Sequence, residues 1–402
     1  MLIEQEDKVH TELWRVSSHM AELKSSIIRE ILKFSSQPGV ISFAGGLPAP
    51  ELFPVEEMKE VATHVLDTFG PSCLQYSISR GILPLREDLA SRAILRGVET
   101  KADNILICSG AQQAIEVIGR TFIEPGDYIL TENPTYVGAL QAFNISQARY
   151  APVEMDEEGM IMDQVADMIE KYKPKLVYTI ANFQNPTGIT MSLKRREQLV
   201  EICSRYNIPI VDDNPYGQIR FDGKEVRDIK AIGGDQVISL STFSKTLAPG
   251  LRIGWMNGPE DMIGIFEKVK QCTDLHTSTF SQYLCSEFIR QGRLDRQIAR
   301  IKPDYRQKRD VMLQAMRDAF PEGITWTEPE GGLFLWVELP KHMSAKDLLP
   351  KAIDLKVAYV YGQPFFPNGE GANTLRLNFS NATHENIVEG ITRLGKLFAE
   401  NM

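Results

Sequence analysis

The chain lacks the features of membrane-spanning, disulfide-bonded and nucleic-acid-binding proteins. Its five cysteines are scattered over 402 residues without a Cys-x-x-Cys pair, which indicates neither a zinc site nor a disulfide framework. No apolar run approaches the length of a membrane span, and the acidic N-terminus lacks the apolar core of a signal peptide. The net charge of -9 disfavours nucleic acid as a partner. We therefore expect a cytoplasmic protein that binds no nucleic acid, membrane or metal ion.

Short apolar runs alternate with amphipathic segments between residues 55 and 260. This alternation predicts an α/β fold, with a mostly parallel sheet sandwiched by helices. The last of seven expected strands follows its predecessor after a loop too short for a crossover helix, so we expect it to be antiparallel. The seven are Asn104–Cys108, Tyr128–Thr131, Ala148–Pro152, Leu176–Ala181, Ile208–Asp213, Val237–Ser241 and Arg252–Asn257.

The pattern changes after Pro259, where a long helical stretch precedes four further strands and two helices. This change predicts a smaller α+β domain built from both ends of the chain. We expect an N-terminal arm over residues 1–45 that packs with the small domain, a large domain over residues 46–295, and the small C-terminal domain over residues 296–402.

Lys245 is the residue whose surroundings point to chemistry. It lies in a segment of hydroxyls and apolar residues, Ser241 to Leu251, directly before Arg252. Burial lowers the pKa of a lysine and makes its neutral amine available as a nucleophile or base, whereas most lysines are solvated. Hydroxyls and an arginine suit a phosphate. An amine beside a phosphate cradle is what pyridoxal 5'-phosphate requires.

Further polar residues lie where other predicted strands end, which is where open α/β sheets bind ligands. Ser109-Gly110-Ala111-Gln112 combines a turn with a helix start and can hold a phosphate, although a plain capped turn has the same sequence. The pair Asp212-Asp213 offers a carboxylate to a protonated pyridine nitrogen; helix capping or a magnesium site are the alternatives.

Three other segments are informative only in combination with the segments described above. Tyr136 can stack on a flat ring, Asn185 lies in an Asn-Pro-Thr-Gly turn, and Tyr216 follows Asp213 closely enough to reach the same ring. Arg376 lies on a predicted strand. If its face is buried, a substrate carboxylate fits its planar fork; if it faces solvent, it is only a surface charge.

Taken together and in this order, these motifs resemble the fold-type I pyridoxal-phosphate enzymes of the class I/II aminotransferases. The form Thr-Phe-Ser-Lys-Thr-x-x-Pro-Gly-x-Arg-x-Gly-Trp, from Thr242 to Trp255, is the most specific part, and the resemblance extends from about residue 25 onward. Gly45-Gly46-Leu47-Pro48 and Gln75-Tyr76-Ser77 look most like the 2-aminoadipate/kynurenine branch.

The resemblance implies a role for each matching residue. Lys245 would bond to the cofactor and later move the substrate proton, while Asp213 would bind the pyridine nitrogen and Arg376 the substrate α-carboxylate. Asn185 and Tyr216 would hydrogen-bond the ring oxygen, and Tyr136 would stack on the ring. The expected phosphate ligands are Gly110, Ala111, Gln112, Thr242, Ser244 and Arg252, where Thr242 replaces the serine of many relatives.

The resemblance also bears on assembly and specificity. Tyr76 would reach the phosphate of a neighbouring subunit, which implies a homodimer with shared active sites. Arg29 would contact the distal group of the substrate, and Gly46 would line the substrate site. One departure is Tyr361-Gly362, which stands where many relatives have Pro-Gly, so the size of the pocket is open.

We therefore expect an aminotransferase that moves an amino group from an L-amino acid of 2-aminoadipate, aromatic or branched type to 2-oxoglutarate by a ping-pong mechanism. A β-lyase or decarboxylase on the same scaffold is an alternative. A ligand-sensing regulator is a non-enzymatic alternative. Such regulators carry an additional basic DNA-binding module, for which the residues before the first motif leave no room.

Overall fold

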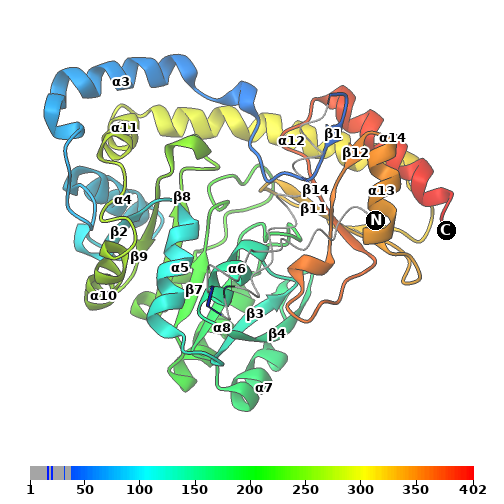
Figure 1. Ribbon diagram of the computed structural model, residues 1–402, viewed down its shortest axis with the longest axis horizontal. Coiled ribbons are helices and arrows are strands. Elements are labelled where there is room, and N and C mark those ends of the chain that lie inside the picture. Colours follow the sequence, from blue (N-terminus) through cyan, green and yellow to red (C-terminus); the bar gives the residue numbers. More distant parts are fainter. Residues whose placement is uncertain (1–15, 18–19, 21–30, 32–37) are drawn as a thin grey trace.

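The computed structural model describes residues 16–17, 20, 31 and 38–402. A large sheet with helices on both faces forms one part of the molecule, and a smaller sheet with its own helices forms the other (Figure 1). The 27-residue helix α12, Arg293–Ala319, runs from the first part to the second. This arrangement confirms the α/β fold with a large and a small unit.

The large sheet has eight strands among the described residues, in the order β2-β9-β8-β7-β6-β3-β4-β5. Neighbours from β8 to β4 pair in parallel, whereas β9 is antiparallel to both β8 and β2. The mostly parallel sheet and its antiparallel strand were predicted; β5, a two-residue hairpin partner of β4, was not. The bounds are β2 Ile105–Cys108, β3 Tyr128–Asn133, β4 Arg149–Asp156, β5 Gly159–Met160, β6 Leu176–Thr179, β7 Ile210–Asp213, β8 Val237–Thr242 and β9 Gly254–Asn257.

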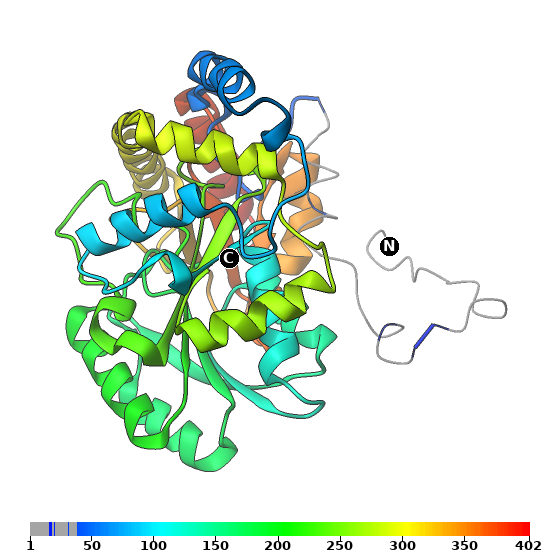
Figure 2. The ribbon, with the colours of Figure 1, turned by 90° about the vertical axis from the view of Figure 1, so that its left-hand side faces the viewer.

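Helices cover both faces of this sheet because its strands are apolar on both sides (Figure 2). On one face, α5, α6 and α10 pack on side chains such as Ile129, Val211 and Leu240. On the other, α7, α8 and α9 pack on Leu130, Val177 and their neighbours. The bounds are α5 Ala111–Phe122, α6 Val137–Ile145, α7 Met162–Tyr172, α8 Leu193–Tyr206, α9 Ile229–Gly233 and α10 Glu260–Gln271.

A third group of helices packs around the β2 edge of the sheet. It consists of α3 Val55–Phe69, α4 Leu83–Leu95, α11 Thr279–Arg290 and the start of α12. The sequence had not singled out α3 or α4. Short 3-10 helices occur at Pro50–Leu52, Gly70–Cys73, Ala102–Asn104, Gly234–Gln236, Pro249–Leu251 and Gln363–Phe365.

The small lobe is built on an antiparallel sheet in the order β10-β11-β14-β13. A second, two-stranded sheet pairs β1 from the start of the chain with β12 in parallel. The division at residues 45/46 and 295/296 stays a prediction, and the second of these boundaries falls inside α12. The bounds are β1 Ile41–Ser42, β10 Thr325–Trp326, β11 Phe334–Glu338, β12 Val357–Ala358, β13 Val360–Tyr361, β14 Thr374–Asn378, α13 Ala345–Asp354 and α14 His384–Ala399.

Within the described part of the chain, no helix is both long and apolar enough to cross a membrane. In the same part, no three His, Cys, Asp or Glu side chains are grouped as metal ligands. The five cysteines are all free thiols.

Candidate active site

The residues singled out in the sequence follow the carboxyl ends of the parallel strands. Tyr136 follows β3, Asn185 follows β6, Asp213 ends β7 and Lys245 follows β8. Parallel strands bring these ends to one edge of the sheet, where open α/β folds bind their ligands. The topology therefore gathers side chains that lie more than a hundred residues apart.

Lys245 lies in the turn after β8, and its Nζ donates a hydrogen bond to the carbonyl of Gly46 at 2.7 Å. Burial and the positive charges of Arg376 and Arg252 lower the pKa of this amine to about 8. The residue itself keeps some accessible surface, so the amine is both reachable and easily deprotonated. A neutral amine is the reactive form of a lysine.

The start of α5 and the side chain of Arg252 form one wall of the site. Gly110 precedes α5 with φ +87°, and a Cβ there would lie 2.3 Å from Nη2 of Arg252. Only glycine allows both this backbone conformation and this close approach. Arg252 donates to the Ser109 carbonyl at 3.0 Å, next to the first-turn N–H groups of Ala111 and Gln112. Such a combination of helix N-terminus and guanidinium attracts an anion.

Two hydroxyls complete this wall from β8. Thr242 and Ser244 are buried, and their hydroxyl oxygens lie 2.9 Å apart. The Thr242 hydroxyl also donates to the Ile253 carbonyl at 2.9 Å and accepts the N–H of Ser244 at 3.1 Å. The main chain thus fixes the Thr242 hydroxyl, while Ser244 can rotate its proton toward a ligand.

Asp213 is the member of the Asp212-Asp213 pair that faces the other site residues. Its Oδ2 accepts the hydroxyl proton of Tyr178 at 2.7 Å, while its buried Oδ1 has no partner in the part of the chain that is described. Burial raises the pKa of Asp213 to about 6, against the lowering effect of the Tyr178 hydrogen bond. An orphaned carboxylate oxygen of this kind needs a donor such as a protonated ring nitrogen.

Tyr136 and Tyr216 lie within electrostatic reach of each other and of Asp213 and Arg376. Burial raises the pKa of both phenols, whereas a hydrogen bond with Asn185 lowers that of Tyr216. The Tyr136 hydroxyl is 3.5 Å from Oε1 of Gln112, so its ring adjoins the α5 wall. Both phenols stay protonated at neutral pH and can donate hydrogen bonds.

Arg376 on β14 is 1% exposed and reaches the site from the small lobe. Its Nη1 donates to Oδ1 of Asn185 at 2.8 Å and its Nη2 to the Ala44 carbonyl at 2.7 Å. Burial lowers its pKa to about 10. Its Nε has no partner among the described residues, so the guanidinium retains a free donor for a carboxylate.

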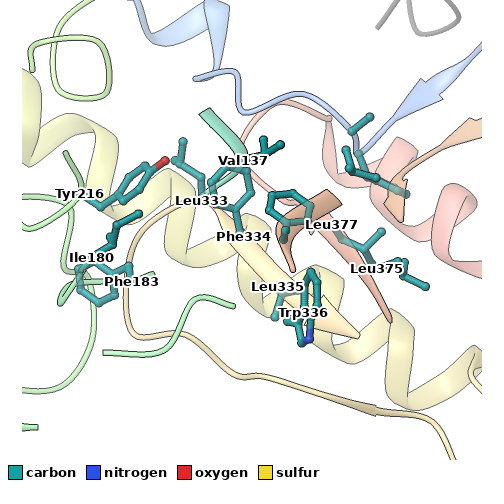
Figure 3. Packing of buried hydrophobic residues seen from close by; sticks show 14 of the residues in the cluster. Val137, Ile180, Phe183, Tyr216, Leu333, Phe334, Leu335, Trp336, Leu375 and Leu377 are labelled. Carbon is teal, nitrogen blue, oxygen red and sulfur yellow. The ribbon is translucent and has the colours of Figure 1, made fainter. Parts of the chain in front are cut away.

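Two aromatic rings hold this guanidinium in place. The centre of the Phe334 ring lies 4.1 Å from Cζ of Arg376, and that of Phe365 lies 5.2 Å away. Phe334 also meets Tyr216 edge-on, with ring centres 6.0 Å apart, and Figure 3 shows the two side chains next to each other. Neither phenylalanine was predicted, because each comes from an element other than the strand that carries Arg376.

These residues fit pyridoxal phosphate as a set. The α5 wall supplies donors and positive charge for a phosphate, and Lys245 supplies an amine. Asp213 offers an oxygen that lacks a partner, and Tyr136 supplies an aromatic face. The structure thus brings together Lys245, Asp213, Tyr216, Tyr136, Asn185, Arg376, Gly46, Gly110, Ala111, Gln112, Thr242, Ser244 and Arg252; their individual roles stay predictions.

Two predicted residues are not part of this cluster. Tyr76 is 78% exposed and touches only the edge of the His276 ring among the aromatic side chains described. Arg29 lies outside the described residues. Tyr178 was missed, although a tyrosine on the strand before Asp213 is a signal that could have been read.

Comparisons with known proteins agree with this geometry. A family profile described as aminotransferase class I and II matches residues 44–394. Aromatic-amino-acid aminotransferase 1 of Thermococcus litoralis is 44% identical, over 94% of this chain and 93% of its own. Sequence similarity also extends to regulators such as the uncharacterized HTH-type transcriptional regulator YdfD of Bacillus subtilis, 30% identical over 96% of this chain and 79% of its own.

Two solved structures are similar over nearly the whole chain. The kynurenine aminotransferase of Pyrococcus horikoshii, in complex with PMP, has a TM-score of 0.93 and 40% identity, and covers 96% of this chain and 98% of its own. LysN, the alpha-aminoadipate aminotransferase of Thermus thermophilus, is complexed with N-(5'-phosphopyridoxyl)-L-leucine. It has a TM-score of 0.90 and 36% identity, with 96% of this chain and 97% of its own covered.

Proposed function

Because the chain belongs to the class I and II aminotransferases, which use pyridoxal phosphate, we propose that it transfers the amino group of an L-amino acid to 2-oxoglutarate by a ping-pong mechanism. The donor is of 2-aminoadipate, aromatic or branched type: the names of its relatives support the first two types, and the leucine adduct bound to LysN supports the third. The observation that carries this proposal is that Lys245, with its lowered pKa, shares one cluster with Arg376 and Arg252. An amine between a carboxylate-binding and a phosphate-binding arginine suits an amino acid beside the cofactor phosphate.

When bound, pyridoxal phosphate supplies an aldehyde carbon and a ring that accepts electrons from the substrate Cα–H bond. Lys245 would supply the amine that holds this carbon before the substrate arrives. Its Nζ would then be the base that removes the proton from the substrate Cα and the acid that returns it to the cofactor carbon. A pKa near 8 suits this two-way transfer at neutral pH, because the amine releases a proton about as readily as it takes one.

Asp213, Asn185 and Tyr216 orient the ring in this proposal. The free Oδ1 of Asp213 would accept a hydrogen bond from the protonated ring nitrogen, whose positive charge would keep the Asp213 carboxylate ionised. Tyr178 fixes the other oxygen of Asp213. Asn185 and Tyr216 would donate to the ring oxygen, and the Tyr136 ring would cover one face of the cofactor.

Arg376 binds the α-carboxylate of both the amino acid and the oxo acid. Asn185 and Ala44 hold two of its donors, and the aromatic pair Phe334 and Phe365 prevents the guanidinium from swinging away. The Gly46 backbone adjoins both Lys245 and Phe334, since a Cβ on Gly46 would be 3.1 Å from Cζ of Phe334. A side chain at residue 46 would therefore press on Phe334, one of the two rings against Arg376.

The enzyme acts as a homodimer in this proposal, with Tyr76 reaching the phosphate of the second subunit. Tyr76, Leu74 and Ile78 expose 78%, 69% and 55% of their surface, which is unusual for a run of large apolar residues. A second copy of the chain would cover them. Light scattering should give twice the mass of the chain, and Tyr76→Phe should weaken cofactor retention while the dimer persists.

A panel of amino donors with 2-oxoglutarate tests the proposed function. Glutamate formation with 2-aminoadipate, aromatic or branched donors is expected, and each donor alone should change the visible spectrum of the holoenzyme once. Pyruvate with ammonia, or carbon dioxide, released without an oxo acid would instead indicate a β-lyase or a decarboxylase. No turnover of any of these donors would refute the proposal.

A further inference from the structure

A buried glutamate, Glu132, lies at the end of β3 beneath the active site and has no counterion among its described hydrogen-bond partners. It is 1% exposed. Its Oε1 accepts the hydroxyl of Thr179 at 2.5 Å and the N–H of Ile180 at 3.1 Å, and its Oε2 accepts Nε2 of Gln184 at 3.0 Å. All three partners are donors from residues 179–184, which begin at the last residue of β6. The carboxylate thus holds a neighbouring turn by hydrogen bonds alone.

The side-chain amide of Gln184 links the Glu132 carboxylate to two turns by hydrogen bonds. Its second amide proton goes to the Pro134 carbonyl at 2.8 Å, while its Oε1 accepts the N–H of Thr187 at 2.9 Å and the Thr187 hydroxyl at 2.8 Å. Every donor and acceptor position of this fully buried amide is therefore in use. Turning the amide over would place donors against donors on one side and acceptors against acceptors on the other.

The two turns joined in this way carry ring-binding residues of the proposed site. Tyr136 follows Pro134 by two residues, and Asn185 directly follows Gln184. Asn185 in turn accepts a hydrogen bond from Arg376. A displacement of Gln184 would therefore move the ring face, the ring-oxygen donor and the carboxylate-binding arginine together.

The same turns are attached to the small lobe. The N–H of Thr135 donates to the Phe365 carbonyl at 2.8 Å, and the Thr327 hydroxyl donates to the Thr187 carbonyl at 2.7 Å. Phe365 is one of the two rings against Arg376. These two hydrogen bonds thus connect the turns held by Glu132 and Gln184 to the small lobe.

We propose that Glu132, acting through Gln184, is a positioning residue that fixes the turns of Tyr136 and Asn185 against the cofactor ring. This inference rests on the proposed cofactor contacts of Tyr136 and Asn185 but not on the identity of the amino donor. Glu132 itself touches neither cofactor nor substrate. It acts by fixing the orientation of the Gln184 side-chain amide.

The Glu132→Gln variant tests whether the donor and acceptor roles at residue 132 matter, because it leaves the volume of the side chain unchanged. A glutamine at 132 has one acceptor oxygen for three donors, and its NH2 would face the NH2 of Gln184 or the donors of Thr179 and Ile180. We expect the holoenzyme variant to release pyridoxal phosphate about tenfold more readily and to show an altered visible circular dichroism band. A purely structural role would lower thermal stability and leave that band unchanged.

The double variant Glu132→Gln/Gln184→Glu should restore most of the hydrogen bonds that each single change breaks. In the double variant, the glutamine donates to the glutamate, the bonds to Thr179, Ile180 and Thr187 return, and only the Pro134 carbonyl stays opposed by an oxygen. We expect it to bind cofactor more tightly than either single variant. Additive effects of the two changes would overturn the proposal.

Glu154→Gln is the matched control. Glu154 lies opposite Asn133 on β4 and accepts its side-chain amide at 2.8 Å, but it is exposed. This variant should keep the wild-type cofactor affinity and circular dichroism. Wild-type values for Glu132→Gln would refute the proposal. If Glu132→Gln fails to fold, Thr179→Val removes one donor to the carboxylate, and an unchanged cofactor band there would refute it equally.

Failure of this proposal is distinguishable from failure of the proposed function. Cofactor release and circular dichroism need no amino donor, so a donor panel without turnover leaves them readable. Conversely, a wild-type cofactor band in Glu132→Gln would leave amino-group transfer by Lys245 untouched.

Discussion

The folded protein should become less stable as the pH rises from 5 to 8, and we expect the Asp212→Asn variant to show much less of this loss. Asp212 is fully buried on the face of the sheet opposite Asp213, and neither of its oxygens has a partner among the described residues. Burial and the nearby Asp228 raise its pKa to about 7, although Arg196 acts in the other direction. At neutral pH this carboxyl group therefore lies at the midpoint of its titration.

The size of the effect follows from the pKa difference. An unfolded chain ionises this group near 3.8, whereas the folded protein keeps the proton until about 7. Between these values the folded state binds one more proton, so stability falls as pH rises, by about 1.4 kcal/mol per pH unit. The loss from pH 5 to pH 7 is thus about 2–3 kcal/mol as an upper limit. Asparagine does not titrate and should lack this slope.

Urea unfolding of the holoenzyme at pH 5, 6, 7 and 8, with saturating cofactor, measures the difference between wild type and Asp212→Asn. The slope contributed by Glu132, whose pKa is raised to about 7, occurs in both proteins and largely cancels. Glu197→Gln, an exposed site beside Arg196, is the matched control and should keep the wild-type slope.

Equal pH slopes in Asp212→Asn and wild type would refute this reasoning. Ser239, the register partner of Asp212, lines a cavity of about 330 Å³ on this face. Water that reached Asp212 from the cavity would solvate the carboxylate and return its pKa toward 3.8. Equal pH slopes in the two proteins would thus indicate that the Asp212 carboxyl group is hydrated in the folded state.

Three changes at the active site should have distinct signatures. Lys245→Ala should lower the rate of the half-reaction by about 10²–10⁴ in single-turnover absorbance traces, because no base then moves the Cα proton; full activity would overturn the assignment. Arg376→Lys keeps the charge but loses the fork that bonds Asn185 and Ala44, so KM for donor and acceptor should rise about tenfold or more in steady-state assays. Tyr178→Phe removes a hydrogen bond that lowers the pKa of Asp213, so the acid limb of the kcat–pH profile should move to higher pH.

The sequence predicted most of the large sheet because its strands are short apolar runs separated by amphipathic helices. The predicted strand Val237–Ser241 and the observed β8, Val237–Thr242, differ by one residue. Helix α3 was missed although its signal was present, because Met58, Ala62 and Phe69 lie at helical spacing beside the buried Val61 and Val65 and pack on the same cluster. Its packing partner α11 lies more than 200 residues away.

The site was predictable where one local segment carries the chemistry and unpredictable where the partners come from distant segments. Lys245, Thr242, Ser244 and Arg252 share a single segment of eleven residues, from the end of β8 to the residue after a 3-10 helix. By contrast, the rings that enclose Arg376 come from β11 and from the 3-10 helix Gln363–Phe365, and no spacing within β14 indicates them. Such contacts depend on how the small lobe meets the sheet.

The contrast between Asp212 and Asp213 shows how one residue of register separates two functions at the end of a strand. Successive side chains on β7 point to opposite faces, so Asp213 meets Tyr178 while Asp212 joins Thr179 and Ser239 in register on the other face. A slip of one residue would turn Asp213 to the opposite face and remove its proposed ring-nitrogen contact. The buried web of Glu132, Thr179 and Gln184 ties the neighbouring strands at this same level. These polar side chains thus fix β3 against the end of β6, and these two strands lead to Tyr136 and Asn185.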